Sequence, residues 1–214
     1  AEKGYLCRER KMDVEFREFP KIARFSRDVI VTEKIDGTNA SVYVVDMTKT
    51  PDERAEYPRD VQPIVALGGD VWLFTASRTR WIPPGEDSHG WTKFVAQHAD
   101  ELAMLGPGFH YGEWWGSGIQ RGYGLQKGEK RFSLFNVHRW GNERPACCSV
   151  VPTLWAGRFD ELSIVDVMES LRLLGSQAAP DFMKPEGIVI FHAQGNVLFK
   201  KTFEKDDAGK NHGA

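Results

Sequence analysis

Short runs of β-branched and aromatic residues, separated by turn-forming residues, recur along almost the whole chain. The 214 residues include 21 Gly and 11 Pro, a content that favours many short turns over long helices. The longest unbroken apolar stretches are about the length of 187–191, far below the roughly 18 residues that span a membrane. No charged-then-apolar leader opens the sequence. We therefore expect a soluble α+β protein in which antiparallel sheet dominates and helices are few.

Nine segments have the composition and alternation of strands. They are Val29–Glu33, Ala40–Asp46, Pro63–Leu67, Val71–Ser77, Phe109–Trp114, Phe132–His138, Cys148–Val151, Gly187–His192 and Val197–Lys201. Residues 193–196 should connect the last two as a hairpin. Apolar residues at helical spacing predict helices over 91–104 and 161–174, the second with Asp160 as N-cap and Gly175 as its stop. Thr48–Asp60 and Arg80–Gly90 are expected loops.

Composition excludes several classes of protein. Hydrophobic residues make up 41% of the chain and charged residues 27%, which excludes wholesale disorder. The three cysteines, Cys7, Cys147 and Cys148, are too few and too oddly placed for a disulfide framework. Without a C-x-x-C, a structural zinc site has little support, and a reducing, cytoplasmic setting is the default expectation.

The net charge of −2 hides an uneven distribution. Residues 121–144 carry an excess of four positive charges, and residues 158–186 an excess of three negative ones. The basic side chains of the first segment are Arg121, Lys127, Lys130, Arg131, Arg139 and Arg144. A polyanion would be attracted to the first segment and repelled by the second. Two ordinary solvated faces would give the same pattern.

One short motif carries chemistry. No P-loop, no G-x-G-x-x-G, no H-E-x-x-H and no G-x-S-x-G is present. What remains is K-x-D-G at Lys34–Gly37, a lysine at a predicted strand end followed by a tight turn. A lysine amine attacks a phosphate only when it is neutral, so a nucleophilic lysine needs nearby cations or burial. Alone, such a lysine is far more often a solvated charge.

Glu33–Asn39 begins an ordered series of motifs. The later members are Ser77–Arg78, Gly112–Gly116, Phe132–Val137, Glu186–Ile190 and Leu198–Lys201. This series, over residues about 29–203, resembles the covalent nucleotidyltransferase superfamily of ATP-dependent polynucleotide ligases and mRNA-capping enzymes. Within it, E-K-I-D-G-T-N is most similar to the bacteriophage and trypanosome-editing type of RNA ligase. The resemblance implies the α+β, antiparallel-sheet-rich adenylation domain of these ligases, an ATP-grasp-like core.

The resemblance also implies roles for single residues. Lys34 is the catalytic nucleophile that becomes the lysyl-nucleotide. The nucleotide-binding residues are Glu33 (through its main chain, beside the base), Asp36 and Gly37 (the turn), Asn39 (phosphates), Arg78 (ribose or a phosphate), Glu113 (ribose), Phe135 (base), Glu186 (ribose or metal), and Lys200 and Lys201 (α-phosphate). Carboxylates suit ribose hydroxyls or Mg²⁺, and an aromatic face suits a purine.

Each role has a plainer alternative. Phe135 lies in an alternating strand and could be core. Glu113 and Glu186 could be ordinary strand-end acids. Arg78 and Arg80 could pair with the acids Glu86 and Asp87, and Trp114 and Trp115 are expected to be packing residues. The last motif of the family commonly reads K-x-K, whereas here the two lysines are adjacent, so the choice between Lys200 and Lys201 stays open.

Only 13 residues follow Lys201, too few for the OB-fold of DNA ligases and capping enzymes or for the helical C-terminal domain of phage-type RNA ligases. We expect one nucleotidyltransferase domain over 1–214, flexible at 1–12 and 204–214. It would be either a natural minimal ligase or an adenylation domain alone.

The expected function is an ATP-dependent RNA ligase that uses Mg²⁺ or Mn²⁺ and joins 5′-phosphate and 3′-OH ends through a lysyl-AMP. The alternatives are a DNA ligase, a GTP-dependent capping guanylyltransferase, and a catalytically silent module that binds nucleic-acid ends. We expect RNA ends or nicks as partners, no membrane, and a cytoplasmic monomer that an accessory domain or protein could assist. A phage-encoded origin stays open.

Overall fold

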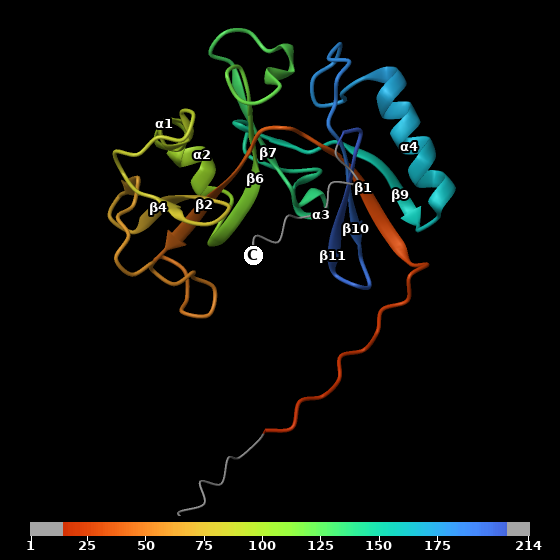
Figure 1. The fold of residues 1–214 in the computed structure, drawn as a ribbon. Coiled ribbons are helices and arrows are strands. Elements are labelled where there is room, and N and C mark those ends of the chain that lie inside the picture. The colour runs from red at the N-terminus through yellow and green to blue at the C-terminus, as the bar shows by residue number, and fades with distance from the viewer. Residues whose placement is uncertain (1–14, 205–214) are drawn as a thin grey trace, which may run out of the picture.

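The computed structural model describes residues 15–204. Of the flexible ends expected at 1–12 and 204–214, all residues except Glu204 lie outside the described residues. Two sheets dominate it, and helices cover one face of each (Figure 1). All strand pairs are antiparallel except β7 with β8. This arrangement confirms the expected α+β class.

The four-stranded sheet has the order β11 (Val197–Thr202), β10 (Gly187–His192), β1 (Asp28–Lys34) and β9 (Thr153–Arg158). Its apolar face packs against α4 (Glu161–Leu174). The buried residues of this contact are Val29, Val31, Ile188 and Ile190 of the sheet and Ile164, Val167, Met168 and Leu171 of the helix. As predicted, the Asp160 side chain caps α4 by accepting from the main-chain N–H of Ser163, and the helix ends at Gly175, whose φ is +79°.

The seven-stranded sheet follows the β1–β2 connection. Its strands are β3 (Val65–Leu67), β4 (Val71–Ser77), β2 (Thr38–Asp46), β6 (Gly108–Gly116), β7 (Lys130–Leu134) and β8 (Cys148–Val150) in spatial order, with β5 (Trp81–Ile82) on β4. α1 (Trp91–Gln97) and α2 (Ala99–Ala103) cover one face. The largest of the three core clusters lies between these helices and the sheet, around Trp91, Leu102, Trp114 and Phe132.

Four parts of the secondary structure differ from the expectations. The expected loop Arg80–Gly90 begins with the short strand β5, which pairs with β4. The helix predicted over 91–104 is broken at His98, whose dihedral angles of −114° and 26° are not helical. The strand predicted over Phe132–His138 ends at Leu134, because Asn136 accepts a hydrogen bond from the Arg139 N–H and starts the single turn α3 (Val137–Trp140). β9 was not predicted at all. It is an edge strand directly after Pro152 and lacks a clear alternation of burial.

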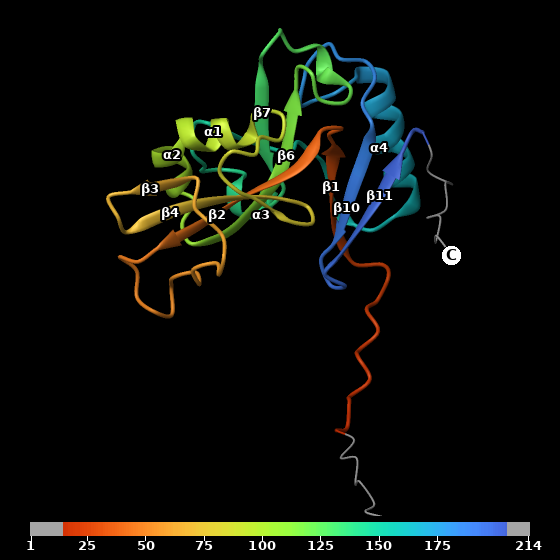
Figure 2. The ribbon, with the colours of Figure 1, turned by 60° about the vertical axis from the view of Figure 1, so that its left-hand side comes forward.

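The chain crosses from one sheet to the other between β1 and β2 (Figure 2). At this crossing Ile35 is buried in a third core cluster, whose other buried members are Trp115, Tyr123, Val151 and Ala179. The cluster therefore fixes the backbone immediately after Lys34. Within the described residues, no helix is long and apolar enough to cross a membrane.

Candidate active site at the junction of the two sheets

Lys34 is the last residue of β1, and its ammonium group contacts a carboxylate from the neighbouring strand. In the antiparallel register Lys34 lies opposite Gly187, the first residue of β10. Glu186 immediately precedes Gly187, so its side chain can reach the Lys34 side chain. The Lys34 Nζ lies 2.6 Å from the Glu186 Oε2. The two side chains are only 24% and 19% exposed. The pairing of strands thus brings together two residues that are 152 positions apart.

The turn after Lys34 is built against β6. The Gly37 N–H donates to the Glu113 Oε1 over 3.0 Å. A Cβ at Gly37 would lie 2.5 Å from the Trp114 carbonyl oxygen and 2.7 Å from the Trp115 Cβ. Because no side chain fits there, the glycine permits the close approach between this turn and β6. Trp114 and Trp115 are themselves buried, which agrees with their expected packing role.

This environment also changes the titration of the Glu113 carboxyl group. Burial raises its pKa to about 7, and the nearby Glu186 and Asp36 carboxylates act in the same direction. The Gly37 N–H and the Lys34 ammonium lower the pKa but do not compensate for burial. Glu113 therefore titrates close to neutral pH, between the turn and the Lys34–Glu186 pair.

Two residues that the sequence analysis missed hold the turn from the other side. Arg121 donates from Nε to the Asp36 Oδ2 over 2.9 Å, and the Tyr123 hydroxyl accepts from the Asp36 N–H over 2.8 Å. Arg121 also donates to the Lys184 carbonyl oxygen over 3.1 Å, two residues before Glu186. The sequence signals this contact only by the two glycines, Gly122 and Gly124, that flank Tyr123. In the structure Tyr123 has a φ of +52°.

These contacts change the interpretation of the basic segment 121–144. Arg121 binds Asp36, Arg131 binds Glu129 at 2.6 Å, and Arg139 donates to the Leu105 carbonyl oxygen. Arg144 donates to main-chain oxygens of residues 140 and 141. Four of the six basic side chains are therefore engaged by other groups of this chain, several of them at the surface.

Glu33 points away from Lys34. Alternation along β1 places its side chain on the α4 side of the sheet, where it is 1% exposed. Its Oε2 accepts from the N–H groups of Gln177 and Ala178 over 2.8 and 3.0 Å. Burial raises its pKa despite these bonds. The carboxylate thus anchors the loop after α4, and the main-chain contact to a base stays a prediction.

The register of β11 separates the two adjacent lysines. Lys200 lies opposite Val189 and Lys201 opposite Ile188. Ile188 is completely buried and packs against α4. Gly187 and Val189, on either side of Ile188, belong to the opposite face of the sheet, and Lys34 lies opposite Gly187. Directly opposite residues share a face, so Lys200 lies on the face that carries Lys34, and Lys201 lies on the α4 face.

The remaining expected residues surround this centre. Asn39 lies opposite Glu113 in the pairing of β2 with β6 and shares its face. Phe135 directly follows β7, is 38% exposed and belongs to none of the three core clusters, so the core alternative does not apply. Arg78 lies in the exposed turn after β4. Its neighbour Arg80 pairs with Glu86 over 2.7 Å, as the plainer alternative expected.

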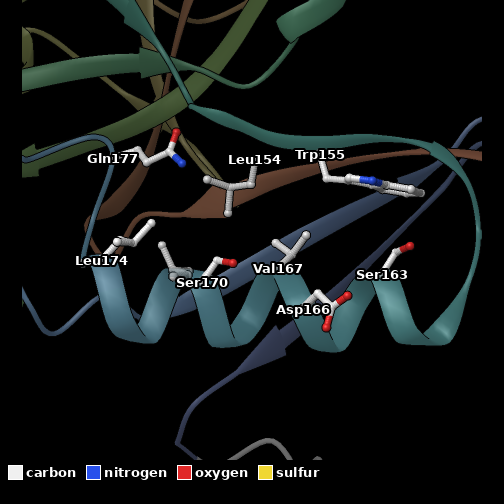
Figure 3. A pocket seen from close by; sticks show the side chains of 10 residues that line it. Leu154, Trp155, Ser163, Asp166, Val167, Ser170, Leu174 and Gln177 are labelled. Carbon is white, nitrogen blue, oxygen red and sulfur yellow. The ribbon is translucent and has the colours of Figure 1, made fainter.

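A separate pocket lies between β9 and α4 (Figure 3). It has a volume of about 280 Å³, and its polar lining includes Ser163, Asp166, Ser170 and Gln177. Because α4 covers the face of the sheet opposite Lys34, this pocket is not part of the candidate active site.

Comparisons with known proteins identify a family and a similar fold. The model of the RNA ligase family matches residues 27–203. A search of curated proteins finds no match. Among solved structures, a Naegleria gruberi RNA ligase variant with ATP and Mn is similar with a TM-score of 0.53 and 17% identity, over 83% of this chain and 49% of that one. The Naegleria gruberi RNA ligase with PPi gives a TM-score of 0.53 and 18% identity, over 83% and 50%. The chain therefore spans about half the length of these ligases.

Proposed function

The chain belongs to the RNA ligase family, and on that premise we propose that it is an ATP-dependent RNA ligase, or the adenylating part of one, with Lys34 as its nucleophile. The reaction has three steps. The neutral Lys34 amine attacks the α-phosphorus of ATP, a P–N bond forms, and the bond to the β-phosphate breaks to release pyrophosphate. The AMP then moves to a 5′-phosphate end. Finally a 3′-hydroxyl attacks that end and AMP leaves.

The observation that carries this proposal is the position of Lys34 beside two carboxylates at the sheet junction. The Lys34 Nζ contacts Glu186, and the Gly37 N–H binds Glu113. In the ion pair the amine is protonated, so the pair must separate and the proton must leave before attack. While the ion pair separates, the contacts of Asp36 with Arg121 and Tyr123 would hold the turn after Lys34 and so keep the nucleophile positioned.

The nucleotide would lie where the Lys34 face of the four-stranded sheet meets the Glu113 face of the seven-stranded sheet. Lys200 would contact the α-phosphate, because its register position places it on the Lys34 face. Asn39 would bind the phosphates, Arg78 the ribose or a phosphate, Glu113 the ribose, and Phe135 the base. The partly exposed ring of Phe135 is free of the core clusters and suits stacking on a purine. The Glu33 main chain would line the base.

The donor set fits a hard divalent cation. The Glu186 carboxylate is partly exposed beside Lys34, and the Glu113 carboxylate titrates near neutral pH close by. Oxygen ligands of this kind suit Mg²⁺ or Mn²⁺. Glu186 would be the protein ligand of the ion. Such an ion would neutralise charge on the phosphates during transfer.

RNA is the substrate that the family favours, and 5′-phosphate and 3′-OH ends are the partners of this proposal. The DNA-ligase and capping alternatives lack support from the family model, which is that of RNA ligases. A catalytically silent end-binding module would not need the Lys34–Glu186 pair or the buried Glu113. A cytoplasmic monomer, with an accessory domain or protein assisting strand joining, belongs to the same proposal.

Two experiments test the function. Incubation with each labelled nucleoside triphosphate and Mg²⁺, followed by denaturing electrophoresis, should show covalent labelling by ATP and not by GTP. Nicked duplexes that differ only in the sugar on the 3′-OH side should then be sealed faster with RNA, because contacts to the 2′-hydroxyl distinguish the two sugars. Labelling by GTP would support the capping alternative, and equal sealing of all-DNA nicks would support a DNA ligase.

A further inference from the structure

Three side chains with metal-binding atoms meet where α1 and α2 approach the start of β8. They are His98, Glu101 and Cys147, and their ligand atoms all lie within 4.8 Å of one another. All three residues are partly buried, so a small ion can reach them. The Cys147 Sγ also lies 3.8 Å from the Cys148 Sγ.

The cluster is ordered by its own contacts. The His98 Nδ1 lies 3.0 Å from the Glu101 Oε1, and the Cys147 N–H donates to the Glu101 Oε2 over 2.9 Å. The His98 ring packs against Phe94, with centroids 4.5 Å apart. Two segments 46 residues apart are thus held with their ligand atoms facing one another.

The chemistry of this set differs from that of the candidate active site. One imidazole nitrogen, one carboxylate oxygen and one thiolate sulfur form the mixed N, O and S environment that zinc takes, whereas Mg²⁺ and Mn²⁺ prefer oxygen. Zinc–ligand bonds of about 2.0–2.3 Å in a tetrahedron place the ligand atoms about 3–4 Å apart. The observed cluster needs only small side-chain adjustments to reach that spacing.

We propose that His98, Glu101 and Cys147 form a binding site for Zn²⁺, with water in the fourth position. The site lies on the helix-covered side of the seven-stranded sheet, since α1 and α2 pack on the face opposite Glu113. The sequence has no C-x-x-C, but the fold brings these three ligands together, and the ion would join the α1–α2 break to the segment that leads into β8. This proposal does not depend on the ligase activity.

The test is a titration of the metal-free chain with Zn²⁺ in a large excess of Mg²⁺, which occupies all-oxygen sites. We expect one tightly bound Zn²⁺ per chain and a rise of several degrees in the melting temperature. Co²⁺ in its place should give the near-ultraviolet absorption of a thiolate–metal bond. Cys147→Ser should abolish that absorption, and His98→Asn should weaken Zn²⁺ binding at least tenfold. The matched control Cys148→Ala should keep both the cobalt–thiolate absorption and the tight binding of Zn²⁺.

The proposal would be overturned by wild-type protein that binds no Zn²⁺ under these conditions. It would equally be overturned if His98→Asn bound Zn²⁺ like the wild type, or if Cys148→Ala lost the cobalt signal, because the ligands would then be different. His98 is partly exposed and outside the core, so its variant should fold even if Cys147→Ser does not. Circular dichroism of each variant checks this directly.

Discussion

The Arg121 guanidinium and the Asp36 carboxylate form an ion pair, with 2.9 Å between Nε and Oδ2, that joins the loop after β6 to the turn after Lys34. The same guanidinium donates to the Lys184 carbonyl oxygen, two residues before Glu186. Arg121 therefore connects the segment that carries the proposed nucleophile to the segment that carries its carboxylate partner. Among the residues that the structure describes, Arg121 contacts neither Lys34 nor Glu186, so we assign it a positioning role.

Arg121→Ala should slow self-adenylation by about 10²-fold, because a displacement of about 1 Å at the reacting group has an effect of that size. Arg121→Lys should restore little, because one ammonium cannot reproduce the planar fork that reaches both acceptors. Arg144→Ala is the matched control, since Arg144 donates to carbonyl oxygens at the end of α3. The measurement is the rate of AMP incorporation at saturating ATP. Equal rates in the two alanine variants would contradict the positioning role.

Glu113 should make the folded state sensitive to pH. The folded protein holds this proton up to a pKa of about 7, whereas the unfolded chain releases it near the ordinary carboxyl pKa of 4.5. The folded state thus binds more protons in this interval, and the free energy of unfolding falls as the pH rises from 4.5 to 7. Glu113→Gln removes the ionisable group and with it this decrease. The free energy of unfolding of the variant should equal that of the wild type at pH 4.5 and exceed it by up to about 3 kcal/mol above pH 7.

Denaturant unfolding of both proteins across this pH range, without nucleotide or metal, measures the difference. Glu169→Gln serves as the control, because Glu169 is an exposed residue of α4 at 3.6 Å from Arg172. A difference between Glu113→Gln and wild type that does not change with pH would show that burial does not raise this pKa. The same Gln variant should adenylate more slowly, because it loses the proposed carboxylate contact to ribose.

The adjacent lysines of β11 provide a matched pair. Lys200→Ala should reduce the rate of adenylation by about 10²–10³-fold, the usual effect of removing one electrostatic contact to the reacting group. Lys201→Ala should have a much smaller effect, because Lys201 lies on the α4 face. Single-turnover labelling with ATP compares the two. A defect confined to Lys201→Ala would mean that the last motif is displaced by one residue.

Much of the fold was predictable because alternation and turn residues are local signals. The strands around 29–33, 40–46 and 187–192, the hairpin after His192 and both ends of α4 agree with their sequence patterns. β9 escaped because an edge strand need not alternate in burial. The break at His98 escaped because the apolar stripe of 91–104 continues through both helices.

The candidate site was predictable only where motifs mark it. Lys34, Gly37, Glu113 and Glu186 do meet, as the order of motifs implied. The contacts of Arg121 with Asp36 span 85 residues, and nothing local in the sequence indicates them. The same limit applies to Lys200, because its face follows from strand register and from the position of α4, neither of which the motif itself contains.

The central claim is that Lys34 carries the nucleotide, and intact-mass measurement after incubation with ATP and Mg²⁺ tests it most directly. The wild type should gain the mass of one AMP, and peptide mapping should place it on Lys34. Lys34→Ala should gain nothing, and Lys34→Arg should also fail, since a guanidinium stays protonated and cannot attack. An added AMP in Lys34→Ala, or one mapped to Lys200 in the wild type, would contradict the assignment.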